Sequence, residues 1–124
     1  MAKKLRDYGL YLEDILESIK KIRNYTKGMS FAEFAKDEKT IDAVVRNFEI
    51  MGEASKQLPQ EIKNKHSEIE WKAMIDFRNV IIHEYFGIDL KIMWDIIKNE
   101  LPPLARKLKR LRQVFKNKKI SHLD

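Results

Sequence analysis

The sequence predicts an all-α protein folded as an up-down bundle of four main helices. Apolar residues recur at helical spacing through most of the chain, and only four glycines and three prolines interrupt them. Helix-capping signatures stand where the apolar pattern resumes after a break. At 124 residues, the chain has the length of one ordinary domain. We therefore expect residues 1–124 to form a single domain, with residues 117–124 as a flexible tail.

The first predicted helix starts at Leu5 and ends before Gly28. Its apolar residues alternate between spacings of three and four, which is typical of a bundle helix. They are Leu5, Tyr8, Leu12, Ile15, Ile19 and Ile22. Ser30 and Glu33 then form a capping box, which predicts a short helix through Ala35.

A second long helix is predicted from about Asp37 to Gln57, with Pro59 closing it. One face carries the apolar stripe of Ile41, Val44, Val45, Phe48, Met51 and Leu58. Another face carries Arg46, Glu49, Glu53 and Lys56, at spacings suited to ion pairs.

A third long helix is predicted from a second capping box, formed by Ser67 and Glu70, to about Gly87. Asp89 is the expected N-cap of the last helix, which the Pro102-Pro103 pair should kink or split. Beyond the prolines an apolar face continues through Leu104, Leu108, Leu111 and Phe115.

Composition excludes several classes of protein and points to one kind of partner. The chain has no cysteine, so disulfides, thiolate metal sites and cysteine nucleophiles are excluded. No apolar run approaches the length of a membrane span, and no signal-peptide pattern opens the chain, so we expect a cytoplasmic protein without membrane contact. The net charge is +6, and the segment between Pro102 and Lys119 is basic without any acid. That segment either attracts phosphate backbones or forms a solvated C-terminal helix.

The segment from Arg78 to Tyr85 places a guanidinium, an imidazole and a phenol within eight residues. Arginine is well suited to hold a phosphate by paired hydrogen bonds, and histidine to act as a general acid or base near neutral pH. On a helical wheel of about 100° per residue, Arg78 falls among apolar residues, while Asp76, Asn79 and His83 share a flank. The segment is therefore a candidate phosphate-chemistry site.

Arg78 and His83 stand about 140° apart on an ideal helix, so their backbones do not point the same way. Either the helix loosens near His83, or the arginine side chain bends round, or a second chain contributes. A two-fold dimer would bring two copies of the segment together across one cleft.

Purely structural roles are also open for these residues. Arg78 is suited to an ion pair with Glu49 or Glu53, and His83 to a helix C-terminal cap. Tyr85 fits a packed aromatic. The other two histidines, His66 and His122, lie in polar segments typical of the surface.

Arg78 to Asp89, written RNVIIHEYFGID, closely resembles the signature of the HEPN superfamily, and in particular that of HepT-like toxins paired with minimal nucleotidyltransferases. The segment RNFEIMGEASKQLP, Arg46 to Pro59, resembles the second-helix block of this family. Ile69 to Trp71 resembles the entry to its motif helix, although a proline is expected where Glu70 stands. A small residue is often expected at Asp76, whose carboxylate would either raise the imidazole pKa of His83 or orient its ring.

The resemblance implies a bundle of four to five helices that dimerises, with both motifs lining a shared cleft. It also implies metal-independent RNA cleavage through the 2′-hydroxyl, with no cofactor. His83 would act as general acid or base, Arg78 would stabilise the phosphorane, and Asn79, Asp76 and Glu53 would support them. For RNA or partner contact we expect Arg46, Arg106, Lys109 and Arg110.

Tyr85 has a separate role by resemblance, as the acceptor of AMP from a cognate nucleotidyltransferase antitoxin in a type VII-like system. The added charge and bulk would repel and block RNA phosphate at the cleft. An alternative function is a non-catalytic subunit whose cleft binds nucleotide or docks a nucleotidyltransferase. Cleavage of RNA by the unmodified protein, lost in His83→Ala, separates the two.

Overall fold

The computed structural model describes residues 5–83 and 87–123, with side chains for all of these except Leu5, Arg6, Arg78, Val80, His83 and residues 119–123. The elements are α1 (Leu5–Thr26), α2 (Phe31–Lys36), α3 (Glu38–Gln57), α4 (Gln60–Lys65), α5 (Trp71–Ile81), β1 (Ile82–His83), β2 (Gly87–Ile88), α6 (Leu90–Asp95), the π-helical segment η1 (Ile96–Glu100) and α7 (Leu101–Leu123). The predicted all-α class is confirmed.

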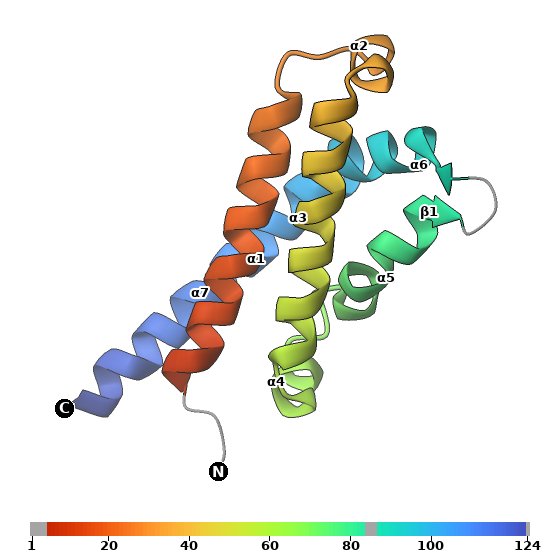
Figure 1. The fold of residues 1–124 in the computed structure, drawn as a ribbon. Coiled ribbons are helices and arrows are strands. Elements are labelled where there is room, and N and C mark those ends of the chain that lie inside the picture. Colours follow the sequence, from red (N-terminus) through yellow and green to blue (C-terminus); the bar gives the residue numbers. More distant parts are fainter. Residues whose placement is uncertain (1–4, 84–86, 124) are drawn as a thin grey trace.

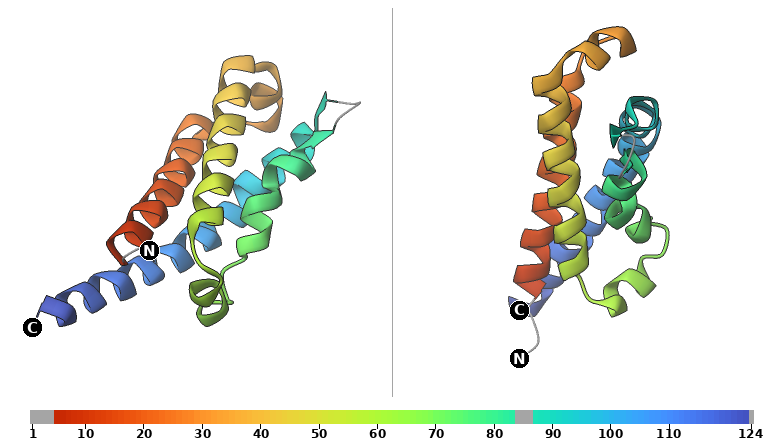
Figure 2. Two further views of the ribbon diagram at one scale, coloured as in Figure 1. Left: turned by 60° about the horizontal axis from the view of Figure 1, so that its bottom comes forward. Right: turned by 45° about the vertical axis from the view of Figure 1, so that its right-hand side comes forward.

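The four long helices form the predicted bundle (Figures 1 and 2). The helices α1 and α3 lie side by side in opposite directions, and α5 packs against α3. Behind them, α7 crosses α1 obliquely. The short helices α2 and α4 lie in the connections at the two ends of α3.

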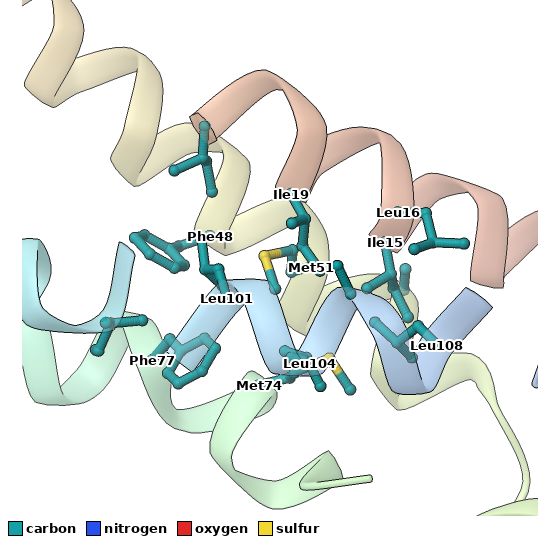
Figure 3. Packing of buried hydrophobic residues seen from close by; sticks show 14 of the residues in the cluster. Ile15, Leu16, Ile19, Phe48, Met51, Met74, Phe77, Leu101, Leu104 and Leu108 are labelled. Atoms are coloured by element: carbon teal, nitrogen blue, oxygen red, sulfur yellow. The ribbon is translucent and has the colours of Figure 1, made fainter. Parts of the chain in front are cut away.

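The hydrophobic core lies where α1, α3, α5 and α7 meet (Figure 3). The apolar seam predicted for α1 is confirmed over its described side chains, since Leu12, Ile15, Ile19 and Ile22 are all at most 1% exposed. From α3 and α5 come Phe48 and Phe77, whose rings meet edge to face at 5.5 Å. Burying such side chains contributes about 1.5–3 kcal/mol each, so this layer fixes how α5 sits on α3.

The first capping box is confirmed. The Oγ atom of Ser30 accepts a hydrogen bond from the backbone N–H of Glu33 at 3.1 Å, and the Glu33 carboxylate accepts one from the N–H of Ser30 at 2.8 Å. The bond that the carboxylate accepts from the Ser30 backbone lowers the pKa of Glu33, and the nearby Ser30 hydroxyl lowers it further. Asp37 caps α3 by accepting from the N–H of Thr40 at 3.0 Å.

The prediction of a second capping box, at Ser67, is wrong. The segment between the second and third predicted helices contains α4, and α5 begins only at Trp71, whose indole N–H donates to the carbonyl of His66 at 3.1 Å. A backbone bond from the N–H of Ile69 to the same carbonyl closes a turn. This turn occupies the residues that a helix starting at Ser67 would need, so burial of Trp71 decides the start of α5.

The predicted helical path to Gly87 is also wrong. The helix α5 ends at Ile81, and β1 pairs with β2 in an antiparallel ladder that sets Ile82 opposite Ile88 and His83 opposite Gly87. β-branched residues favour extended backbone. Gly87 has a φ of +81°, a conformation that suits glycine.

The last helical stretch begins as predicted, with the carboxylate of Asp89 accepting from the N–H of Ile92 at 3.0 Å. The Pro102-Pro103 pair does not break it. Because proline lacks the N–H that would bond four residues back, the turn before the pair widens into η1, where the N–H of Leu101 donates to the carbonyl of Ile96. The helix α7 then runs to Leu123, and the flexibility expected of residues 117–124 stays a prediction.

Candidate active site

The motif spans the end of α5 and the strand that follows. Arg78 lies in the last turn of α5, and His83 lies in β1, two residues beyond the helix. The helix therefore ends before His83. This agrees with the first of the three alternatives, in which the helix loosens near His83. The side chains of Arg78 and His83 lie outside the described part of the structure, as does the whole of Tyr85.

Backbone hydrogen bonds fix the position of this strand against α6. Beyond the ladder of β1 and β2, the N–H of Asp89 donates to the carbonyl of Ile81 at 2.6 Å. The same residue caps α6, so one aspartate joins the last residue of α5 to the first turn of α6. The backbone of His83 is thus held by a closed hairpin rather than by helical geometry.

A cleft of about 870 Å³ lies beside the motif helix, between α1, α3 and α5. It brings together three of the residues predicted from the sequence, Asn79, Glu53 and Arg46. Asn79 is exposed and supplies an amide from α5. Asp76 is half-buried and is not among the residues that line the cleft.

The charges of this cleft are mixed. Its cationic side chains are Arg46 and Lys56, and its carboxylates are Asp14, Glu49 and Glu53. Lys56 already pairs with Glu53 at 3.2 Å. Within the described side chains, the cleft therefore carries more carboxylates than cations. Arg78 of the motif is the cation that the sequence places nearest to Asn79.

The motif helix passes close to Gly52 of α3. This glycine is buried, and a Cβ atom placed on it would lie 3.6 Å from the carbonyl oxygen of Ile75. One turn further on, the buried Ser55 hydroxyl donates to the carbonyl of Met51 at 2.7 Å and meets the sulfur of Met74 at 3.7 Å. Small residues on α3 thus set the depth at which α5 packs.

The four residues predicted for RNA or partner contact do not form one surface. Arg46 lines the cleft beside α5, whereas Lys109 lines a different groove between α1 and α7. Arg106 and Arg110 are exposed on α7. The sequence alone did not predict that cations of α1 line the same groove as Lys109. Their spacing on α1 indicates only an exposed face, and the groove forms only where α7 lies beside this face.

The described residues offer neither a metal site nor a membrane-spanning helix. No group of three or more histidine, aspartate or glutamate side chains within residues 5–83 and 87–123 is arranged to hold a metal ion. None of the helices in these ranges combines the length and apolar character needed to cross a membrane.

Comparison with known proteins identifies the family. The family model described as "Ribonuclease HepT-like" matches residues 15–111. The chain is 42% identical over 112 residues to "Putative RNase MJ0127" of Methanocaldococcus jannaschii, covering 90% of each protein. It is 43% identical over 108 residues to "Probable ribonuclease HepT" of Thermococcus cleftensis, covering 87% of this chain and 98% of that protein.

A bacterial relative agrees with these two. The chain is 43% identical over 103 residues to "Putative RNase TTE0752" of Caldanaerobacter subterraneus, covering 83% of this chain and 92% of that protein. No solved structure gives a significant match. The matched residues 15–111 extend from α1 into α7 and include the whole described hairpin that carries His83. The chain therefore belongs to the ribonuclease HepT-like family of the HEPN superfamily.

Proposed function

We propose that the protein is a metal-independent endoribonuclease. The proposal rests on the motif, with Arg78 at the end of α5 and His83 in the adjoining strand, in a chain of the ribonuclease HepT-like family. RNA carries its own nucleophile, so the protein needs only to position the phosphate, move protons and stabilise charge. No metal ion is required for any of these tasks.

His83 takes the proton of the 2′-hydroxyl while its oxygen attacks the adjacent phosphorus. Arg78 stabilises the charge of the pentacoordinate phosphorane by paired hydrogen bonds. The bond from phosphorus to the 5′-oxygen then breaks, and this oxygen takes a proton from the protonated His83 or from water. The products are a 2′,3′-cyclic phosphate and a 5′-hydroxyl. Asn79, Glu53 and Asp76 are supporting residues. The amide of Asn79 is exposed and lines the cleft, so it can reach a phosphate bound there.

The active form is proposed to be a homodimer with both motifs in one cleft. The described side chains of a single chain give this cleft more carboxylates than cations, which is poor for a polyanion. A second copy would add another Arg78 and His83. Beside the hairpin, Ile88 and Ile92 are 37% and 39% exposed, and such apolar surface supports an interface at this end.

Control of the activity is proposed to follow the type VII-like toxin–antitoxin pattern, in the cytoplasm. A cognate minimal nucleotidyltransferase would transfer AMP to the hydroxyl of Tyr85. The sequence places Tyr85 two residues after His83, so the added phosphate would bring negative charge and bulk beside the catalytic imidazole. RNA would then be repelled and blocked.

The test is cleavage of total RNA by purified protein, shown by mass to be unmodified, in excess EDTA. We expect cyclic-phosphate ends from the wild type and a loss of about 10²–10⁴-fold in rate from His83→Ala, the usual contribution of a general acid or base. His66→Ala is the matched control, because His66 faces Glu68 at 3.8 Å, away from the motif. A His83→Ala protein that cleaves as fast as His66→Ala contradicts the catalytic assignment.

A non-catalytic subunit is the second candidate. The excess of carboxylates in the cleft favours it, because such a cleft suits a protein partner better than RNA. It predicts that a folded, unmodified dimer leaves RNA intact and still binds its nucleotidyltransferase.

A further inference from the structure

A second groove, of about 760 Å³, lies on the other side of α1 from the cleft beside the motif. Its walls are the C-terminal half of α1 and the segment from η1 into α7. These two walls diverge from the point where α7 crosses α1 (Figure 1). Its floor is apolar and includes Leu16, Ile19 and Ala105. The groove is therefore an open trough between two long helices.

The rim of this trough is strongly basic. Six cations and two carboxylates line it, which leaves a net charge of +4. The six cations are Lys20, Arg23, Lys27, Lys98, Lys109 and Arg112. Arg112 is neutralised by Glu13 at 3.1 Å, and Lys98 covers the ring of Trp94 at 4.8 Å. No ion pair among the described residues engages the other four cations.

The cations of the rim are spread along the trough instead of converging on one point. Lys98 and Lys109 are eleven residues apart, which corresponds to about 16 Å along the axis. Lys116 stands seven residues after Lys109 and so extends the same face of α7. A small anion needs charges that converge, whereas a row of charges fits a chain of phosphates. The cleft beside α5 differs from the trough, because its described side chains include more carboxylates than cations.

We propose that the groove between α1 and α7 binds the phosphate backbone of single-stranded RNA outside the scissile position, which we call the RNA groove. This inference rests on the proposed ribonuclease function and names the surface that supplies affinity for its substrate. A basic trough that follows a backbone is typical of sequence-tolerant binding to single strands. Duplex RNA is instead recognised across successive minor grooves, over about 16 base pairs.

The test measures binding of a fluorescent, fully 2′-O-methylated RNA oligonucleotide by anisotropy over a range of salt. This probe lacks the 2′-hydroxyl, so binding is independent of cleavage. The variant is Lys20→Gln/Arg23→Gln/Lys109→Gln, three exposed side chains of the RNA groove. The control is Lys36→Gln/Lys39→Gln/Lys65→Gln, which removes the same charge from α2, α3 and α4. Unfolding midpoints verify that both variants are folded.

We expect the groove variant to lose at least about tenfold in affinity at moderate salt. The slope of log affinity against log salt should fall by about 2, since each lost phosphate contact on a single strand contributes about 0.7. The control should stay close to the wild type. Equal losses in the two variants would show a general effect of charge and overturn the proposal.

Two further outcomes keep this inference separate from the proposed function. If the wild type cleaves RNA but the groove variant binds the probe as tightly as the control, the RNA groove is wrong and the ribonuclease stands. If the groove variant keeps its RNA affinity and loses only its nucleotidyltransferase partner, the groove is a protein-docking surface and the proposal fails. Strong binding of the probe through the groove without any cleavage by the wild type would overturn the ribonuclease alone.

Discussion

His83 owes its position to its partner in the ladder. It lies opposite Gly87, which has a φ of +81° and no heavy atom within 4 Å of the place of a Cβ. Alanine in this left-handed conformation costs about 1–2 kcal/mol. Gly87→Ala should therefore lower the stability by that amount and also lower RNA cleavage, because relief of the strain would shift the strand that carries the imidazole.

Gly28 provides the matched control for this substitution. Its φ is +77°, and the space around it is equally open, but it lies after α1 and far along the chain from the motif. Gly28→Ala should destabilise the protein to a similar extent, as measured by urea unfolding. Because Gly28 lines the RNA groove and not the cleft beside the motif, the cleavage rate at saturating RNA should stay unchanged under conditions where the protein is folded. Equal loss of cleavage in the two variants would mean that stability alone limits activity.

The candidate motif residues could be named from the sequence, but the backbone that carries them could not be placed from it. Arg and His at this spacing are visible without a structure, and so is the conflict of about 140° on a helical wheel. The resolution depends on the bond from Asp89 to Ile81 and on the pairing of β1 with β2. Those contacts link residues that no helical period connects. The signal that was present, the β-branched pair Ile81 and Ile82, is weak beside the helical pattern around it.

At the scale of elements, the packing of α5 on α3 leaves room for only a small side chain in place of Gly52. A Cβ atom here would lie 3.6 Å from the nearest backbone oxygen of α5, which is an ordinary contact. Gly52→Ala should therefore be tolerated and even stabilise the protein by about 0.5–1 kcal/mol, the helical advantage of alanine over glycine. Gly52→Val should instead destabilise it by about 1–3 kcal/mol, because its added methyl groups press on α5.

Urea unfolding of both variants measures these effects, and RNA cleavage shows whether α5 has moved. A valine variant as stable as the alanine variant would show that α5 yields easily and that Gly52 does not set its depth.

Helix boundaries differed in how far the sequence could predict them. The cap at Ser30 is local, since both of its hydrogen bonds lie within four residues, and it was predicted correctly. The start of α5 depends on the burial of Trp71 in the core, which is not a local property. The capping-box pattern at Ser67 therefore predicted the wrong start for this helix. The widened turn of η1 likewise reflects a helix that the core holds together despite two prolines.

The whole molecule divides its charge between two faces of α1. The cleft beside α5 holds more carboxylates than cations among its described side chains, and the RNA groove holds a net charge of +4. The net charge of +6 for the chain gives no hint of this division, which appears only when α7 lies across α1. Affinity for RNA and chemistry on RNA would then be supplied by different surfaces. In the proposed dimer, the second chain would add cations to the cleft beside α5.

The shared cleft of the proposed dimer predicts complementation between two inactive chains. Arg78→Ala and His83→Ala should each abolish cleavage as homodimers. In a mixed dimer, one cleft half combines the Arg78 of one chain with the His83 of the other, while the second half has neither. If the two residues act across the interface, mixed dimers should recover up to about half of the wild-type rate.

Co-expression of the two chains with different affinity tags, followed by purification on both tags, isolates the mixed dimer. A double variant, Arg78→Ala/His83→Ala, paired with wild type is the control, because it leaves no complete combination across the interface. If the two residues act within one chain, the outcomes exchange: the control pair keeps half of the activity and the mixed dimer has none. The comparison therefore decides whether the catalytic unit is one chain or two.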